Sequence, residues 1–320
     1  MSSRPHDCFN HSIPQISFSL RATYSTFTEK FCHQYFQEDF MQQLTELIKK
    51  RASCRTYADK PTGEKALQEF SRIVAKEYRG PFGNRPEFQL ISMDMSSPTE
   101  RKKLGTYGVI KNARFFLAGK IKKAEKAVED YGYCMESLIL QATALGLGTC
   151  WLAGTFNATG FAQKVELQPD ELLPAISPVG YPANHKSLTE KIFRRFAGAN
   201  YRKPWSDIFF KGNFSEPLTW EQAGVYAAAI ENVRRAPSAS NRQPWRILLD
   251  NAGNIFHFYL ERSFGYKLRE IAIQDIDMGI AMNHFELTAR EAGYAGGWSN
   301  DKNAPQKKRW DYIVSWQDKS

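Results

Sequence analysis

Alternate residues in one short segment could bind a phosphate. Arg51, Ser53 and Arg55 are separated by single residues. In an extended chain, alternate side chains point to the same side. Two guanidinium groups and a hydroxyl on one side have the charge and the geometry that suit a phosphate group. A basic strand on the protein surface would have the same pattern, so the segment alone leaves both interpretations open.

A second stretch could hold a flat polar ligand. Residues 236–245 read Ala-Pro-Ser-Ala-Ser-Asn-Arg-Gln-Pro-Trp, between a predicted helix and a predicted strand. Pro237 restricts the backbone. The side chains of Ser238, Ser240 and Asn241 can bond their own backbone instead of extending a helix. The pattern predicts a tight corner rich in hydrogen-bond donors. An ordinary helix-to-strand connection is the alternative.

A glycine-rich passage follows the longest predicted helix of the first half. Residues 146–154 read Gly-Leu-Gly-Thr-Cys-Trp-Leu-Ala-Gly. Glycine allows a backbone to pass close to a ligand. Because the passage follows a helix and lacks the spacing GxGxxG, it is not a Rossmann dinucleotide fingerprint. Cys150 has no histidine or basic partner nearby in the sequence, so a nucleophilic thiol is not expected.

The remaining polar residues indicate no acid–base or metal site. There is no Ser-His-Asp motif and no nucleophile elbow. The six histidines show no ligand spacing, and His284 lies in a helical pattern typical of a core or rim residue. We therefore expect no metal. The five cysteines have irregular spacing and form no CxxC pair, which favours reduced thiols in a cytoplasmic protein.

Composition and charge limit the possible partners. The chain has 320 residues, of which 42% are hydrophobic and 24% charged, as in ordinary globular proteins. No apolar run reaches the ~18 residues of a membrane span. The net charge of +9 favours anionic ligands, but the basic residues are dispersed and form no nucleic-acid motif. A phosphorylated ligand is favoured, with no nucleic-acid or membrane partner.

Helices and strands of an α+β fold must position these residues. Apolar periodicity predicts a helix that begins at residue 41 and further helices over 64–78, 100–104, 123–145, 220–235 and 276–292. It predicts strands over 88–93, 113–118, 150–152, 173–181, 245–249, 255–260 and 310–316. Gly146 and Gly293 are typical stops for the two long helices.

The sequence also repeats within itself. A shift of 147 residues places the helix that ends at Gly146, and the following Trp151, onto the helix that ends at Gly293 and the following Trp298. A shift of 157 places Asn84-Arg85 onto Asn241-Arg242. We interpret the chain as two copies of one α+β unit. Coincidence between two amphipathic helices is the alternative, but it does not explain the paired glycines and tryptophans.

Together these motifs resemble the nitroreductase family of FMN-dependent oxidoreductases. Members carry R-x-S-x-R-x-[FY], A-P-S-x-x-N-x-Q-P-W, a helix that ends in G-L-G-T-C-W with a later glycine, G-Y-P after a strand, and a basic R-K-P-like segment. In this chain the corresponding residues are Arg51 to Tyr57, Ala236 to Trp245, Gly146 to Trp151 with Gly154, Gly180 to Pro182, and Arg202 to Pro204. The resemblance covers about residues 41–320.

The resemblance implies an unusual arrangement of the family's site. Members are homodimers with two FMN sites, each built from the R-x-S-x-R segment of one subunit and the Pro-Ser corner of the other. Here the first copy of the corner, residues 80–88, is degenerate, and the complete copy lies in the second half. The second half has Ile208, Phe210 and Gly212 where the phosphate set should recur. The resemblance therefore implies a nitroreductase-like fold in which one monomeric chain acts as an internal pseudo-dimer.

We expect this pseudo-dimer to have one complete FMN site, one decayed site and four segments. Residues 1–40 lack the apolar region of a secretory signal and are expected to form a loosely ordered tail. Residues 41–187 should form the first half, 188–217 a connection and 218–320 the second half.

Roles in the complete site follow from the matched motifs. Arg51, Ser53 and Arg55, with Arg202 and Lys203, should hold the phosphate and the ribityl chain or the N1–O2 edge of FMN, where positive charge stabilises reduced flavin. Leu152, Ala153 and Gly154 should pass its N5–O4 side. Pro237, Ser238 and Ala239, with Asn241 of the same motif, should cover its other edge. Residues 105–112 give no secure match to the residues that contact the pyrimidine edge in many members.

The implied activity is ping-pong electron transfer. NAD(P)H gives a hydride to flavin N5 and leaves, and a nitroaromatic, quinone or similar small-molecule acceptor then takes the electrons. This chemistry belongs to the flavin, so no catalytic residue of the protein is required. Two alternatives stay open: a flavin carrier or sensor with little turnover, and a relative without flavin whose phosphate set binds another anion.

Overall fold

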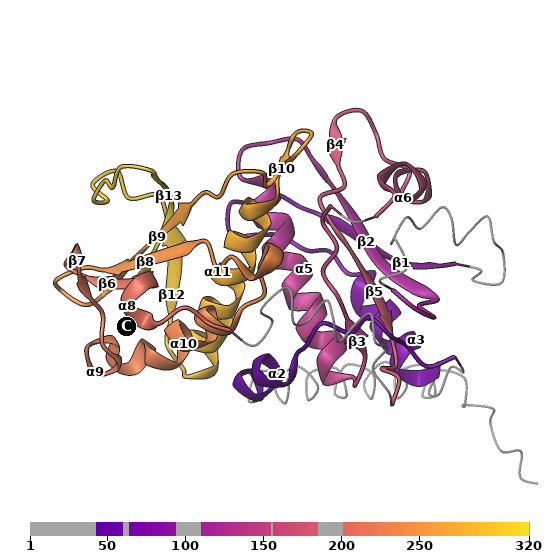
Figure 1. Cartoon of the computed structure of the whole chain (residues 1–320), viewed down its shortest axis with the longest axis horizontal. Coiled ribbons are helices and arrows are strands. Elements are labelled where there is room, and N and C mark those ends of the chain that lie inside the picture. Colours follow the sequence, from indigo (N-terminus) through magenta and orange to yellow (C-terminus); the bar gives the residue numbers. More distant parts are fainter. Residues whose placement is uncertain (1–42, 60–63, 94–109, 155, 185–200, 320) are drawn as a thin grey trace, which may run out of the picture. The chain divides into compact units, whose positions relative to one another are not determined.

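Two sheets flank a layer of helices in the computed structural model, which describes residues 43–59, 64–93, 110–154, 156–184 and 201–319 (Figure 1). The tail expected over residues 1–40 and the short helix expected over 100–104 lie outside the described residues. None of the helices in the described part has the length and hydropathy needed to span a bilayer.

The first sheet has the strand order β1-β2-β5-β3. Its antiparallel strands are β1 (Glu87–Ser92), β2 (Phe115–Lys122), β5 (Ile176–Gly180) and β3 (Gly148–Thr149), and the short β4 (Glu171–Leu172) pairs with the end of β2. Helix α3 (Glu64–Val74) contacts β1.

Both faces of the central strand β2 are covered. Phe116 packs on Phe161 of α6 (Ala158–Lys164). Three residues later, on the opposite face, the carbonyl of Gly119 accepts a hydrogen bond from Tyr131 of α5 (Ala127–Ala144). This double coverage explains why β2 is a nearly continuous apolar run rather than an alternating one.

The second sheet repeats the order of the first and then extends it. Its order is β12-β13-β9-β8-β6-β7, formed by Gly296–Ser299, Trp310–Asp318, Ile255–Glu261, Trp245–Leu249, Phe209–Lys211 and Asn213–Pro217. Read from β8, the order β8-β9-β13-β12 corresponds strand by strand to β1-β2-β5-β3. β6 adds to this repeat as a parallel neighbour of β8.

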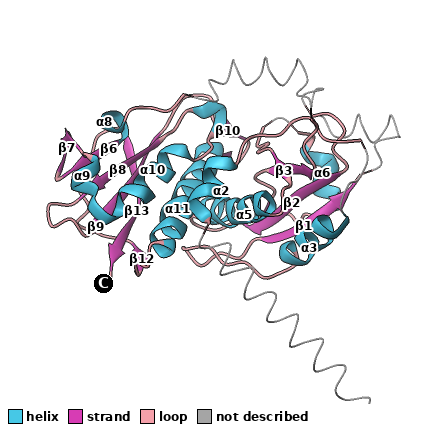
Figure 2. Ribbon diagram, turned by 90° about the horizontal axis from the view of Figure 1, so that it is seen from below, coloured by secondary structure: helices cyan, strands magenta, loops and turns pink. Residues whose placement is uncertain are grey.

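In the described part of the chain, a layer of helices lies between the two sheets (Figures 1 and 2). The longest are α5 and α11 (Ile273–Glu291), which pack against each other and are buried on most sides. Helices α2 (Leu44–Lys50) and α10 (Ala227–Arg235) pack against α11. A helix buried on most sides carries apolar residues all round instead of on one face, so periodicity identifies it less clearly than length does.

α5 and α11 meet at one glycine from each helix. A Cβ atom on Gly132 would collide with the carbonyl of Ile276, and a Cβ atom on Gly279 would collide with the carbonyl of Glu129. On α5, Glu129 lies three residues before Gly132, and on α11, Ile276 lies three residues before Gly279. The contact is therefore reciprocal, as between surfaces related by a twofold axis.

Several boundaries differ from the sequence-based expectation. The helix expected over 220–235 is divided into α9 (Trp220–Ala223), a 3-10 turn (Gly224–Tyr226) and α10, because the backbone at Gly224 adopts φ 53°. α5 begins at Ala127, after Lys126 with φ 58°. Short elements without a full period, including α6, β4 and β12, were not predicted.

The connection expected over 188–217 is wrong in its second part. Residues 205–217 form α8 (Trp205–Ile208), β6 and β7, and the two strands belong to the second sheet. Phe209 is fully buried. A three-residue strand is too short to show a period of two, which is why the pattern gave no signal.

Candidate functional site

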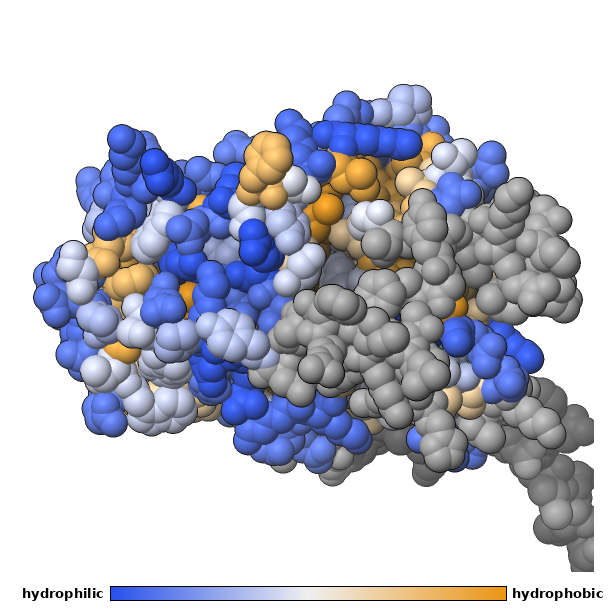
Figure 3. All heavy atoms as spheres, in the orientation of Figure 1, coloured by the Kyte–Doolittle hydropathy of each residue, from blue (hydrophilic) through white to orange (hydrophobic). Residues whose placement is uncertain are grey.

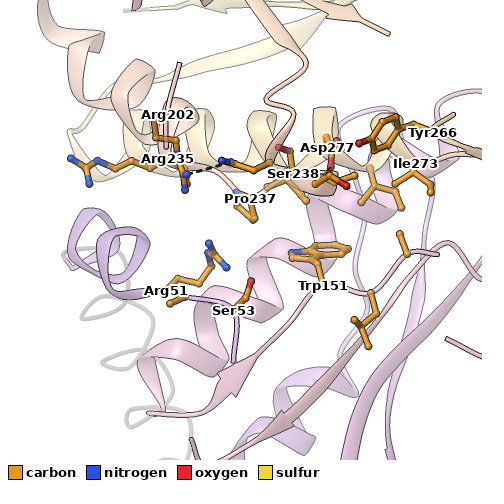
Figure 4. Close-up of a pocket in the computed structure, with 18 of the residues that line it drawn as sticks. Arg51, Ser53, Trp151, Arg202, Arg235, Pro237, Ser238, Tyr266, Ile273 and Asp277 are labelled. Atoms are coloured by element: carbon orange, nitrogen blue, oxygen red, sulfur yellow. Dashed lines mark hydrogen bonds between the residues drawn. The ribbon is translucent and has the colours of Figure 1, made fainter. Parts of the chain in front are cut away.

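A cavity of about 1300 Å³ opens between the two halves (Figure 4). Eleven of the predicted site residues line it, and they come from four separate segments of the chain. They are Arg51, Ser53, Arg55, Leu152, Ala153, Gly154, Arg202, Pro237, Ser238, Ala239 and Asn241. The fold thus brings together motifs as far apart in the sequence as Arg51 and Asn241.

Lys203 is the predicted residue that does not line this cavity. Its backbone N–H donates to Gln243 Oε1 at 2.9 Å. Burial and the nearby charge of Arg246 lower the pKa of its side chain, and Glu261 acts in the opposite direction. In extended backbone, adjacent side chains point to opposite sides, so Arg202 faces the cavity and Lys203 faces away.

The segment with alternating arginines lies extended beside the first sheet. Helix α2 ends at Lys50, and Arg51 leaves it with φ −57° and ψ 124°. Ser53 forms a parallel bridge with Thr149, and the N–H of Cys54 donates to the Thr149 carbonyl at 2.7 Å. This pairing fixes the alternation, which places Arg51, Ser53 and Arg55 on the wall of the cavity.

One end of the cavity is strongly basic. It contains Arg51 and Arg202 together with Arg234 and Arg235 from the last turn of α10. The carboxylate of Glu231 accepts hydrogen bonds from Arg234 at 2.7 and 2.8 Å and lies 3.0 Å from Arg235 Nε. Burial, then the positive charges of the other three arginines, lower the pKa of Arg202 to about 10. This end therefore favours an anion.

Sequence reasoning missed the two α10 arginines. Arg234 and Arg235 directly precede the 236–245 motif, so their adjacency was the available signal. That signal is weak because basic residues in the last turn of a helix are common for a different reason, since they interact favourably with the helix dipole.

The corner at residues 236–245 is held in a strained backbone conformation. Ser240 has φ 48° and Gln243 has φ 50°. Two hydrogen bonds fix the turn: the N–H of Ala239 donates to Asp277 Oδ1 and the N–H of Gln243 donates to Ser238 Oγ, each at 2.9 Å. A left-handed conformation at residues other than glycine persists only where the surroundings impose it.

Asp277 lines the cavity beneath this corner. It is 3% exposed, and its Oδ2 is buried without a hydrogen-bond partner in the described part of the chain. Burial, with a smaller contribution from Asp275, raises the pKa of Asp277 to about 8. Asp130, which lies 147 residues earlier on α5, accepts hydrogen bonds from the N–H groups of both Phe82 and Asn84.

The other end of the cavity is apolar and aromatic. Figure 4 shows Trp151, Ile273 and Tyr266 away from the arginines. The indole N–H of Trp151 donates to Glu136 Oε2 at 2.7 Å. Tyr266 precedes the hairpin of β10 (Lys267–Leu268) and β11 (Ile271–Ala272), beside which Figure 3 shows hydrophobic atoms at the surface. A ligand with an anionic group at one end and a flat ring at the other fits this polarity.

Among the described residues, no group of three or more His, Cys, Asp or Glu side chains is placed to hold a metal ion.

Comparison with known proteins gives one family match and several similar structures. The profile of the family described as "Putative TM nitroreductase" matches residues 43–289. A structure from Thermotoga maritima MSB8, described as a putative nitroreductase, is 20% identical, covers 86% of this chain and 92% of its own, and has a TM-score of 0.52. An FMN-dependent nitroreductase from Clostridium difficile R20291 is 20% identical, covers 44% of this chain and 88% of its own, and has a TM-score of 0.34. No curated protein matches.

Proposed function

The chain belongs to the family described as "Putative TM nitroreductase", and from this premise we propose that it is an oxidoreductase that works through bound FMN. In this proposal NAD(P)H supplies the electrons and a nitroaromatic, quinone or similar small molecule accepts them. The observation that carries the proposal is the polarity of one cavity, basic at one end and apolar at the other, built by the motifs that carry the resemblance.

The residues at the basic end fit the phosphate of FMN. Arg51, Ser53 and Arg202 line this end, where the cavity lies between the two halves of the fold. The Nε atom of Arg51 is buried and has no hydrogen-bond partner in the described residues. A buried donor without a partner is costly, and a bound phosphate oxygen would remove that cost.

The residues at the apolar end fit a flat ring. Leu152, Ala153 and Gly154 line the cavity, and a Cβ atom on Gly154 would meet only Ile273 at 3.8 Å. The positive charge at the opposite, basic end would favour the anionic, reduced form of the cofactor. Bound FMN would supply the hydride chemistry, and the chain's own residues would bind it, orient it and exclude water.

We also propose that the two halves are degenerate copies related by a pseudo-twofold axis. Three observations support this: the shared strand order, the reciprocal contact of Gly132 and Gly279, and the equivalent roles of Asp130 and Asp277 beneath their corners. The chain would then act as a monomer with a built-in partner, in the cytoplasm.

A single flavin site per chain follows from this arrangement. The positions that correspond to the arginine segment fall in and beside β6, where Ile208 and Phe210 are buried apolar residues. They offer no group for a phosphate. We therefore expect one FMN per chain, and two would contradict the proposal.

Anaerobic spectroscopy tests the proposed activity. The protein loaded with FMN should lose its flavin absorbance when NADPH or NADH is added and regain it when a nitroaromatic or a quinone follows. Bound flavin that neither nucleotide bleaches would indicate a carrier or sensor. A protein that FMN neither colours nor stabilises against heat would indicate a relative that binds another anion.

A further inference from the structure

A buried acid–histidine pair joins the two halves behind the cavity. Glu136 lies on α5 and His284 on α11, and neither side chain is exposed. His284 Nε2 lies 2.9 Å from Glu136 Oε1, and His284 Nδ1 lies 2.9 Å from the carbonyl oxygen of Asn232 on α10. The sequence predicted a core or rim position for His284, and the structure places it in the core.

The partners of His284 determine how many protons the pair holds. The carbonyl oxygen of Asn232 can only accept, so Nδ1 of His284 must carry a hydrogen. A hydrogen bond between Nε2 and the carboxyl oxygen of Glu136 needs a second hydrogen, on one atom or the other. The pair is therefore neutral as a whole, either as carboxylate and imidazolium or as carboxylic acid and imidazole.

The pair contacts two residues of the cavity wall. The other carboxyl oxygen of Glu136 accepts the indole N–H of Trp151 at 2.7 Å. Glu136 Oε1 lies 3.9 Å from Arg51 Nε. Among the described residues, Glu136 is the one acidic residue within ion-pair distance of Arg51. The side chain of Arg51 is 8% exposed, so water screens this interaction little.

We infer that the Glu136–His284 pair sets the charge that Arg51 presents to an anion, and that both are positioning residues of the anion site. Because the hydrogen-bonded pair is neutral as a whole, no net negative charge lies behind Arg51, whose guanidinium charge acts on the cavity. A Glu136 carboxylate without its imidazole partner would pair with Arg51 instead and lower the affinity for an anion.

Asp277, on the same helix as His284, also lines the cavity, and its Oδ2 has no hydrogen-bond partner in the described residues. Three other carboxylates on the neighbouring helices have partners of their own. Glu291 accepts from the N–H and hydroxyl of Thr45 at 3.2 and 2.7 Å. Glu286 accepts from Tyr133 at 2.7 Å and pairs with Arg290 at 2.5 Å. Glu231, on α10, is held by the two arginines that follow it on that helix. The coupling is assigned to Glu136 because its carboxyl group contacts both Arg51 and Trp151, and to His284 because it bonds that carboxyl group.

Three variants separate charge from structure. His284→Gln keeps an amide donor toward Glu136 but removes the imidazole that neutralises its carboxylate, so it should weaken anion binding about tenfold. Glu136→Gln can donate to neutral His284 and accept from Trp151, so it should keep the affinity. The double variant contains no carboxylate and should recover the affinity that His284→Gln loses.

Sulfate is the probe because its charge is constant near neutral pH, whereas a phosphate group titrates near ~6. Sulfate affinity of the flavin-free full chain is measured by calorimetry at constant ionic strength, with Arg51→Ala as the baseline. Equal losses in both single variants, further loss in the double variant, or no sulfate binding in the wild type would each overturn the inference.

The inference rests on the proposed function only for the identity of the natural anion, the FMN phosphate. Sulfate binding with the expected order of affinities among the variants, together with no binding of FMN, would uphold the charge coupling and reject the flavin proposal. Binding of FMN with the same affinity in all three variants would reject the coupling and leave the flavin proposal intact.

Discussion

Not every basic residue of the predicted site lines the cavity: Arg51 and Arg55 do, and Lys203 does not. Arg51→Ala together with Arg55→Ala removes two charges from the cavity wall and should weaken FMN binding by more than tenfold, because charged hydrogen bonds to a phosphate contribute about 1.5–3 kcal/mol each. Lys203→Ala is the matched control, since Lys203 faces away. Flavin fluorescence quenching measures both. An equal loss in the control would restore the role that the motif assigned to Lys203.

The raised pKa of Asp277 predicts how the stability of the folded protein depends on pH. Its pKa is raised by burial to about 8, whereas an unfolded Asp titrates near ~3.9. Between these values the folded state binds a proton that the unfolded state has lost, so the stability due to Asp277 declines as pH rises from about 4 to about 8. The slope is at most about 1.4 kcal/mol per pH unit.

Asp277→Asn removes this titration and keeps an oxygen for the N–H of Ala239. Urea unfolding of the flavin-free protein should show the variant gaining stability relative to the wild type at each step from pH 5 to pH 8. Parallel curves over that range would show that Asp277 is ionised in the folded protein.

At the scale of elements, the α5–α11 crossing is the most constrained contact. Gly132→Ala and Gly279→Ala each place a methyl group against a backbone carbonyl of the other helix, so each should destabilise the protein by about 1–3 kcal/mol or more. Gly297→Ala is the control, because its nearest neighbour is the flexible end of Lys319. Chemical denaturation measures all three. A neutral result for either helix glycine would mean that the helices can separate at little cost.

The sequence predicted elements well where they are long and stopped by glycine. Both central helices and the strands beginning at Trp245 and Ile255 are confirmed, with small shifts of their ends. β6 was missed because three residues carry no period, and its pairing with β8 is a tertiary contact. The cavity was predicted from motifs, whereas Asp277, Tyr266 and the α10 arginines join it through folding and carried no local pattern of their own.

At the scale of the whole molecule, the position of the cavity predicts cooperative behaviour. The helix layer packs against both sheets, and the cavity takes residues from both halves, so neither half alone contains the whole of the proposed FMN site. We expect one unfolding transition, with the same midpoint by far-ultraviolet circular dichroism and by tryptophan fluorescence. The two signals differ in origin, because Trp151 is the one tryptophan of the first half and six lie from Trp205 onward.

Binding of FMN should raise the unfolding midpoints measured by circular dichroism and by fluorescence by the same amount. A ligand at a hundred times its dissociation constant stabilises the folded state by about 2.7 kcal/mol, and a site shared by both halves applies that stabilisation to the whole transition. If FMN shifted the fluorescence transition and left an earlier dichroism transition in place, the second half would hold the ligand unaided. The first half would then not supply the phosphate end through Arg51, and the proposal of a built-in partner subunit would fail with it.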